Sequence, residues 1–439
     1  MTAVPSRATN WATTERPIGM LAAVHLAAGI AMTLLIIVWH PHEGDPLPFL
    51  PTAEKIVAGG MPYRDVPSEY PPLAVLNILI PRVLSGFSHP MYQTWFSVIS
   101  IIFAVATFFI VWWIARQGWS VERPMDAAAI FVGLALTAVP LVVWRFDILP
   151  AFLSAVALAI WVAGRAGWTG FALGVGAMAK IYPIFLGPVF ALAAIAERRY
   201  KQVVAIILGG AIAVGLILAF PVLVAGTKAF SYVFYQENRG VEVEALPGAI
   251  AMFAHTFFRQ PATVQEGFGA WQITSPVLTT LAAPTFLFNI ALLAITVLAC
   301  AYSFRRDVRN TGLVQPQTLV TYLFATVMVV ILINKVLSPQ YLIWLLPFMA
   351  LLSGRQSLLL LVILVITVFI YPLNFASLLV MRPNPVVALN LRNVLLLVLF
   401  LWVVWPRRPA RAPDVPPNGE QSAALTSTSE RSYVGEGAE

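Results

Sequence analysis

The chain is predicted to be an all-α protein that crosses a membrane many times. Of its 439 residues, 59% are hydrophobic and only 11% are charged, and the mean hydropathy is +0.82. Soluble domains carry about 25% charged residues, so this composition favours a polytopic membrane protein. Long apolar runs separated by short charged segments point to the same class.

The apolar runs are expected to form about 11–13 transmembrane helices within residues 18–405, since a full crossing needs about 20 apolar residues and a half-helix fewer. A further stretch at about 72–86 begins with proline and is expected to lie in, or dip into, the outer membrane interface. The runs lie near residues 18–39, 92–115, 126–143, 147–163, 168–180, 182–196, 203–225, 284–303, 318–334, 340–352, 357–376 and 386–405.

The basic residues indicate which loops stay in the cytoplasm. The clusters ERRYK, FRRDVR and PRRPAR lie on one side of the membrane if the N-terminal residues 1–17 are cytoplasmic, and loops rich in Lys and Arg are retained on that side. We expect a plasma-membrane protein with both termini inside and two large outer loops at about 40–91 and 226–283. The tail 406–439 is rich in Pro, Ser, Gly and Glu and is expected to be disordered.

Several other classes of protein are disfavoured. The one cysteine, Cys300, leaves no disulfide framework. The net charge of +7 is spread between apolar runs, so nucleic acid is not an expected partner. The sequence carries no Walker-type phosphate loop and no His/Cys cluster, so neither a bound nucleotide, nor a metal, nor another cofactor is expected.

The first outer loop contains the stretch GGMPYRDVPSEYPPL at 59–73. Its prolines prevent a continuous helix, because each fixes φ and lacks an N–H group. Arg64, Asp65, Glu69 and Tyr70 are poor choices for a structural loop beside lipid. A rigid loop that carries charged and aromatic side chains is more typical of a binding or catalytic site.

Two acidic residues, Glu43 and Asp45, come directly after the first apolar run. A carboxylate in this position can act as a general base that deprotonates an acceptor hydroxyl. Acids are also common at the start of loops, so the structural interpretation stays open.

Further charges lie at the ends of apolar runs, in VVWRFDILP, GAMAKIYPI and ILINKVLSPQYLIW. Charges at this depth are costly unless they are paired or line a cavity, so Arg145, Asp147, Lys180 and Lys335 are candidate site residues. The two lysines suit compensation of phosphate charge. The alternatives are interfacial snorkelling and a structural Arg145–Asp147 pair.

Aromatic and basic residues near the same surface extend the candidate site. Tyr182, Gln340 and Tyr341 follow or adjoin the two lysine segments; the tyrosines fit either an aromatic belt or stacking on a sugar. His255 and Arg259 are spaced i, i+4 in a segment with helical character. They either reach one phosphate from one helix face or belong to a plain amphipathic interfacial helix.

Four of these blocks resemble those of a known family. GGMPYRDVPSEYPPL, VVWRFDILPAFLSAVALAI, GVGAMAKIYPIFLGPV and NKVLSPQYLIWLLPF are similar to the recurrent blocks of glycosyltransferase family 87, over about residues 18–405. The resemblance implies a GT-C fold. It also implies inverting transfer of a sugar, most often mannose, from a polyprenyl-phosphate donor to a lipid or glycan acceptor of the cell envelope, at the outer face of the membrane.

The resemblance also suggests roles for individual residues. The general base of the family follows the first span, in a pattern that places Asp45 at the base and Phe49 at the aromatic position. The proline-rich HPHEGDPLP departs from the commoner pattern, so Glu43 and Asp65 remain alternatives. Lys180, Lys335 and His255 are the candidates for holding the donor phosphate.

Two other functions are compatible with a polytopic protein of this kind. A flippase for polyprenyl-linked sugars would need polar residues through the membrane depth, whereas the spans here are read as apolar at mid-depth. A catalytically inactive GT-C-like subunit is the other alternative. The sugar, the acceptor, the linkage and the oligomeric state are not encoded in any pattern of the sequence.

Overall fold

The computed structural model describes residues 18–39, 47–86, 88–235, 239–352 and 354–405. Most of them are helical, and every apolar run expected from the sequence contains helix, which confirms the all-α class. Glu43, Asp45, the N-terminal residues 1–17 and the tail 406–439 lie outside the described residues.

Five helical segments in the described part of the chain are long and apolar enough to cross a membrane. Two of them continue beyond their main helix, as a π-helical turn after α4 and as two short helices after α10. The segments are α1 (Met20–Trp39), α4 (His89–Ile114) with η2 (Ala115–Trp119), α10 (Tyr200–Ala225) with η4 (Gly226–Phe230) and α11 (Ser231–Phe234), α13 (Pro276–Thr311) and α18 (Pro383–Val404).

The remaining helices are shorter, and many begin with proline at the first turn, where its missing N–H costs nothing. The apolar ones are α3 (Pro72–Leu84), α5 (Pro124–Thr137), α6 (Val139–Val143), α7 (Ile148–Val162), α8 (Ala166–Ala177), η3 (Tyr182–Leu186), α9 (Gly187–Ala196), α12 (Leu246–Phe258), α14 (Pro316–Leu332), η5 (Pro339–Leu345), α15 (Leu346–Leu352) and α16 (Arg355–Ile370). The smallest are η1 (Leu47–Phe49), α2 (Leu50–Val57) and α17 (Phe375–Leu379).

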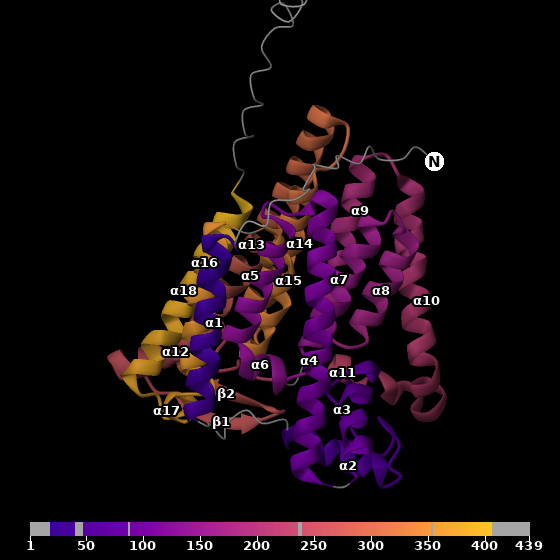
Figure 1. Cartoon of the computed structure of the whole chain (residues 1–439). Helices are drawn as coiled ribbons and strands as arrows, with labels where there is room; N and C mark the ends of the chain where they lie inside the picture. The colour runs from indigo at the N-terminus through magenta and orange to yellow at the C-terminus, as the bar shows by residue number, and fades with distance from the viewer. Residues whose placement is uncertain (1–17, 40–46, 87, 236–238, 353, 406–439) are drawn as a thin grey trace, which may run out of the picture. The chain divides into compact units, whose positions relative to one another are not determined.

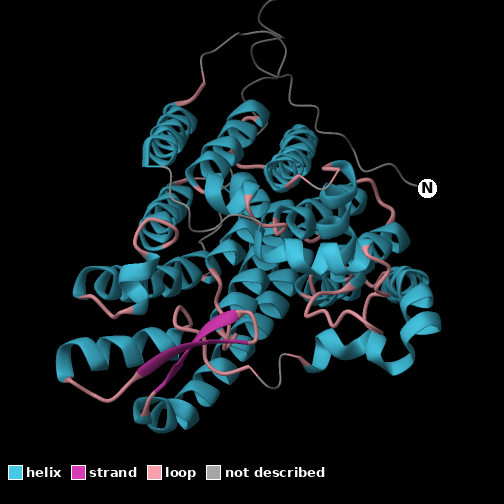
Figure 2. Ribbon diagram, turned by 90° about the horizontal axis from the view of Figure 1, so that it is seen from below, coloured by secondary structure: helices cyan, strands magenta, loops and turns pink. Residues whose placement is uncertain are grey.

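One end of the helical body, the lower end in Figure 1, gathers α2, α3, α6, α11, α17 and a β-hairpin. The hairpin pairs β1 (Thr263–Gly267) with β2 (Ala270–Thr274) in antiparallel register, with Gly267 opposite Ala270. Both residues of its turn, Phe268 and Gly269, have positive φ, as the tight two-residue turns of hairpins require. Figure 2 shows the two strands side by side at this end.

The second large loop is shorter than the sequence indicated. Helix α13 begins at Pro276, within the segment 226–283 that was expected to be a loop, and Pro284 lies inside the helix. The Ser275 side chain accepts a hydrogen bond from the N–H of Val277 at 3.3 Å, and proline follows at the first helical position. This Ser-Pro start is a helix N-cap signal that the hydropathy pattern alone does not contain.

Glycines bring α8 and α10 into close contact. A Cβ built on Gly170 would lie 2.0 Å from the carbonyl oxygen of Ile206, and one on Gly209 would lie 2.0 Å from that of Gly167. Helices approach this closely in membranes when small residues line the contact. The interior is completed by α15, in which all seven residues are buried.

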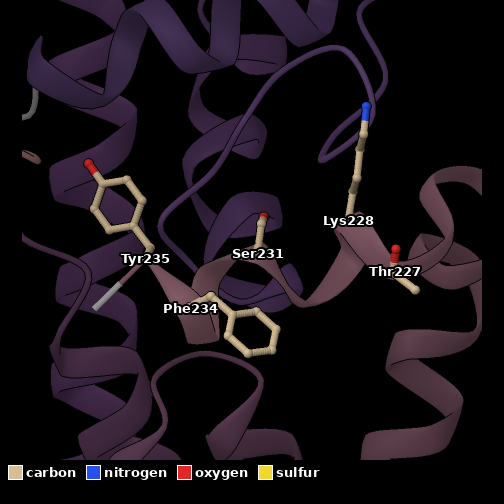
Figure 3. Close-up of a pocket in the computed structure, with 5 residues that line it drawn as sticks. All are labelled: Thr227, Lys228, Ser231, Phe234 and Tyr235. Carbon is tan, nitrogen blue, oxygen red and sulfur yellow. The ribbon is translucent and has the colours of Figure 1, made fainter. Parts of the chain in front are cut away.

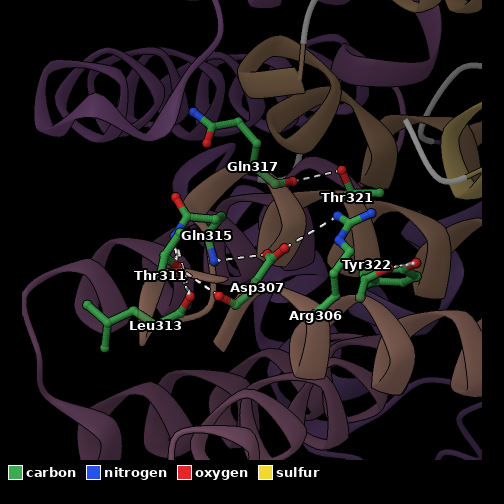
Figure 4. Close-up of polar contacts among 9 residues, drawn as sticks. Arg306, Asp307, Thr311, Leu313, Gln315, Gln317, Thr321 and Tyr322 are labelled. Carbon is green, nitrogen blue, oxygen red and sulfur yellow. Dashed lines mark hydrogen bonds and ion pairs between the residues drawn. The ribbon is translucent and has the colours of Figure 1, made fainter. Parts of the chain in front are cut away.

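The opposite end is closed by polar contacts around Asp307, near the end of α13 (Figure 4). Its carboxylate accepts the N–H of Gln315 at 3.1 Å and pairs with Arg306 at 3.3 Å. The Glu197 carboxylate accepts the N–H of Val314 at 2.8 Å. These acids accept the N–H groups of the two residues just before α14 and so fix the turn between α13 and α14.

Candidate functional site

A buried ion pair lies at the centre of the lower end. Asp147 precedes α7 and Lys180 follows α8, and the Lys180 ammonium is 3.1 Å from Asp147 Oδ1. The indole N–H of Trp344 donates to the same oxygen at 2.9 Å. Asp147 is 1% exposed and Lys180 is 15% exposed at the side chain. Together with Trp344, the pair joins three segments that are far apart in the sequence.

Aromatic rings surround the Lys180 ammonium. Its distance to the ring centroid is 4.9 Å for both Phe146 and Tyr341, and 5.9 Å for Tyr70. These are cation–π distances, which help to hold a partly desolvated ammonium. Tyr182 and Tyr341 stack on Trp344 at 4.1 and 4.2 Å. The rings therefore pack mainly on one another, which makes stacking of a sugar on Trp344 unfavourable.

A second group of charges lies beside this pair. The Arg239 guanidinium is 3.7 Å from Glu69 Oε2, and its buried Nε has no hydrogen-bond partner among the described residues. Burial raises the pKa of Glu69, while the Arg239 charge opposes the shift. The hairpin turn also lies against Glu69, because a Cβ on Gly269 would be 2.8 Å from Oε1.

Glu242 extends this group toward the segment before η5. The Ser338 hydroxyl donates to its carboxylate, with distances of 3.0 and 3.3 Å to the two oxygens. Burial, reinforced by the negative charge of Glu244, raises the pKa of Glu242 to about 8. Near neutral pH this carboxyl is therefore largely protonated, which makes it a group that can hold or release a proton.

Glu244 is held by a fully buried partner. Arg392 of α18 is 0% exposed and its Nη1 lies 2.6 Å from Glu244 Oε2. A second nitrogen of Arg392 donates to the Glu244 carbonyl oxygen at 3.0 Å. Arg392 lies near the middle of α18, which is long and apolar enough to cross a membrane, so this helix is not apolar along its whole length. The reason is a partner in the loop before α12 that the local sequence does not reveal.

The loop at 59–73 folds against itself. The Tyr63 hydroxyl donates to the Tyr70 carbonyl oxygen at 2.7 Å, and Tyr63 is buried. Arg64 and Asp65 instead lie on the surface and pair at 2.8 Å. Hydrogen bonds from Arg64 hold the pKa of Asp65 below its usual value. Asp65 is thus already engaged as an ionised partner of Arg64.

The suggested Arg145–Asp147 pair does not form. Asp147 binds Lys180, whereas Arg145 donates hydrogen bonds to the Tyr371 hydroxyl and to the Trp144 carbonyl oxygen. Arg145 and Asp147 lie two residues apart just before α7, so their side chains point in different directions and bind different partners.

His255 and Arg259 do not share a helix face. Helix α12 ends at Phe258, and Arg259 adopts a left-handed backbone with φ of 54°, which removes the i, i+4 relation. The His255 Nδ1 bonds to the Gln260 carbonyl oxygen instead. Lys335 and Gln340, by contrast, are close to the charged group. The Lys335 carbonyl accepts the N–H of Glu242 at 2.9 Å, and the half-buried Gln340 lies in η5.

The described chain resumes close to these groups after Glu43 and Asp45. The Phe49 ring contacts those of Tyr70 and Phe146 at 6.0 and 5.6 Å, and Arg145 lies 5.8 Å from its centroid. Phe49, four residues after Asp45 in the sequence, therefore lies among the rings around Lys180.

Sequence reasoning missed Arg239, Glu242, Glu244, Ser338 and Arg392 as site residues. A signal for some of them existed, since VEVEALP places two acids in an apolar segment and Arg392 interrupts an apolar span. Among the described residues, no group of three or more His, Cys, Asp or Glu side chains is arranged to hold a metal.

Comparison with known proteins agrees with this architecture. The profile of glycosyltransferase family 87 matches residues 69–332, a segment that contains Glu69, Asp147, Lys180, Arg239, Glu242 and most of the apolar runs. A search among curated proteins found no significant match. The matched segment covers more than half of the 439 residues. The chain therefore belongs to glycosyltransferase family 87 and is a membrane glycosyltransferase.

Proposed function

We propose that the protein transfers a sugar, with mannose as the first to test, from a polyprenyl-phosphate donor to a hydroxyl of a lipid or glycan acceptor. The reaction takes place at the outer face of the plasma membrane, and both termini are cytoplasmic. The observation that carries the proposal is the convergence of buried acids, bases and rings at one end of a helical membrane body. A lipid-linked donor suits such a site because it enters from the membrane and needs no nucleotide-binding domain.

The proposed reaction needs one base and one site for negative charge. A carboxylate takes the proton of the acceptor hydroxyl, and the oxygen attacks the anomeric carbon from the face opposite the leaving group. The bond between that carbon and the phosphate oxygen breaks, and the polyprenyl phosphate departs with the electron pair. The configuration at the anomeric carbon is inverted.

We assign the base to Asp45, with Glu43 and Asp65 as alternatives. The covalent chain limits the distance between the Cα atoms of Asp45 and Phe49 to about 14 Å, and Phe49 packs beside the charged groups. Asp65 is the weakest of the three, because its carboxylate is already paired with Arg64.

Arg239 and Lys180 are the residues we assign to the departing phosphate. The buried Nε of Arg239 has no hydrogen-bond partner in the part of the chain that the structure describes, and guanidinium groups bind phosphate with paired hydrogen bonds. Lys180 contributes a compact positive charge. Because its ammonium is paired with Asp147, that charge would then be shared between Asp147 and the phosphate.

The test is transfer of radiolabelled mannose from polyprenyl-phosphate-mannose to lipid acceptors, in membranes that contain wild-type protein or Asp45→Asn. Loss of transfer at normal expression supports both the class of donor and the base. If transfer survives in Asp45→Asn but is lost in Glu43→Gln or Asp65→Asn, the role of the base is reassigned to Glu43 or Asp65. No transfer by the wild type from mannose or arabinose donors overturns the donor assignment and favours a flippase or an inactive subunit.

A further inference from the structure

A pocket outside the charged group lies where α10 ends. The short helices η4 and α11 line it with Thr227, Lys228, Ser231, Phe234 and Tyr235, and its volume is about 480 Å³. Figure 3 shows Lys228, Ser231 and Tyr235 rising on the same side of this segment. Pockets of a few hundred cubic ångströms are the usual size for small polar ligands.

Two polar side chains of the pocket, Lys228 and Ser231, form no hydrogen bond or ion pair with the rest of the described chain. The Ser231 Oγ is buried and has no hydrogen-bond partner there, which is costly unless a ligand or water satisfies it. Lys228 is exposed, and no described acid forms an ion pair with it. Its charge lowers the pKa of Asp65, but that carboxylate is neutralised by Arg64. The pocket therefore presents a net positive charge together with free hydroxyl groups.

An apolar surface leads from the membrane to the pocket. Along α10, Ile212, Leu216 and Phe220 follow one another at four-residue spacing and are each more than half exposed, and Leu223 is 85% exposed. A stripe of this kind on a membrane-crossing helix is covered by acyl chains. The pocket lies just beyond the end of the stripe, so acyl chains along the stripe would bring a phospholipid headgroup to it.

We propose that this pocket binds the phosphate of an anionic membrane phospholipid. Lys228 neutralises the phosphate, the Ser231 and Thr227 hydroxyls donate hydrogen bonds to its oxygens, and the acyl chains lie along α10. The contact between Tyr235 and Arg239, with 5.9 Å from guanidinium to ring centroid, places the bound headgroup beside the charged group. The proposal does not depend on which sugar donor the enzyme uses.

The experiment measures lipid binding by the purified full-length protein, using titration with phosphatidylglycerol or phosphatidylcholine in detergent. We expect tighter binding of phosphatidylglycerol, weakened about fivefold in Lys228→Gln, since one basic residue contributes about 1 kcal/mol to such binding. Ser231→Ala should weaken it as well. Lys201→Gln, at the other end of α10, is the matched control and should bind like the wild type.

The source of the phosphate is tested in the same assay. Inorganic phosphate and a polyprenyl phosphate are added as competitors, and thermal unfolding of each variant verifies the fold. Displacement by polyprenyl phosphate at equal concentration would assign the pocket to the donor and overturn the proposal. Equal affinity of wild type and Lys228→Gln for phosphatidylglycerol would also overturn it. Because binding is measured without transfer, these outcomes are independent of the sugar-transfer assay.

Discussion

Lys180 is a candidate for two roles, stabilising the fold through a buried ion pair and binding the donor phosphate. Its ammonium is held by Asp147 and by several rings, so its charge is already compensated in the free protein. A phosphate that binds there competes with Asp147 for the same cation. A structural role and a ligand-binding role therefore make different predictions for single and double substitutions.

We expect Asp147→Asn and Lys180→Met each to destabilise the fold by about 3–5 kcal/mol, because each leaves a buried charge without its partner. The double variant should regain most of this loss. The measurement is thermal and denaturant unfolding in detergent. Asp65→Asn, which breaks the exposed Arg64 pair, is the control and should change stability by less than about 1 kcal/mol.

Additive losses in the double variant would contradict the buried-pair interpretation. If the double variant folds well and still fails to transfer sugar, Lys180 also contacts the donor. Full recovery of transfer would limit Lys180 to a structural role.

Glu242 gives the site a dependence on pH. Its pKa is raised from 4.5 to about 8, so the folded state favours the protonated form. The stability from this preference is fully present below about pH 4.5 and is lost as the pH rises through about 8. We expect the melting temperature of the wild type to fall between pH 6.5 and 9. The fall in Glu242→Gln should be smaller than the wild-type fall by at least about 2 °C.

The exposed Glu266 on β1 provides the control for this experiment, and Glu266→Gln should follow the wild-type curve. Parallel curves for Glu242→Gln and the wild type would mean that Glu242 is ionised throughout the range.

The residues that could be predicted differ in kind from those that could not. Arg145, Asp147 and Lys180 could be singled out because a charge at the end of an apolar run is visible in the local sequence. The partner of Asp147, Trp344, is 197 residues away, and Arg392 is 148 residues from Glu244. Contacts of this range leave no periodic pattern, so pairings such as Lys180–Asp147 required the structure.

At the scale of helices, the contact between α8 and α10 depends on glycine. We expect Gly170→Ala to destabilise the protein by about 1–3 kcal/mol, because its Cβ would meet the Ile206 backbone and cannot be accommodated by a side-chain movement. A Cβ added to Gly215 of α10 would meet no atom within 4 Å. Gly215→Ala should therefore be neutral or stabilise slightly, through better helix propensity.

Unfolding of both variants under one set of conditions provides the comparison. Equal stability of Gly170→Ala and Gly215→Ala would show that the two helices can separate at little cost, contrary to the close approach of their backbones.

Helices were the most predictable elements, and their ends the least. Apolar runs located the helices, of which five segments in the described chain are long enough to cross a membrane. Helix α13 begins at Pro276, after a Ser-Pro cap, and the β-hairpin between α12 and α13 was not expected. Each strand has only five residues, and neither TVQEG nor AWQIT shows a regular apolar alternation, so the pattern by which a strand is recognised is missing.

At the scale of the whole protein, the arrangement predicts which loops are accessible from each side. The single native thiol, Cys300, is buried, so introduced cysteines can be labelled selectively. We expect Met61→Cys, in the loop before α3, to react with an impermeant maleimide in intact cells. Lys201→Cys, in the first turn of α10 beside the basic segment ERRYK, should react only after permeabilisation, because positive loops stay inside.

Labelling of Lys201→Cys in intact cells, with protection of Met61→Cys, would invert the topology and move the charged groups to the cytoplasmic face. The donor would then have to be presented on that side of the membrane.

The length of α10 links the pocket to the thickness of the bilayer. Its 26 residues span about 39 Å, which exceeds the roughly 30 Å of a typical hydrocarbon core. We therefore expect the helix to tilt in a thin bilayer or to extend into the interface, and the glycine contacts couple α8 to it. Because η4 and α11 continue directly from α10, a change of tilt moves Lys228 relative to the membrane surface. We therefore expect the acyl-chain length of the surrounding lipids to change how deeply the proposed phosphate pocket lies in the interface.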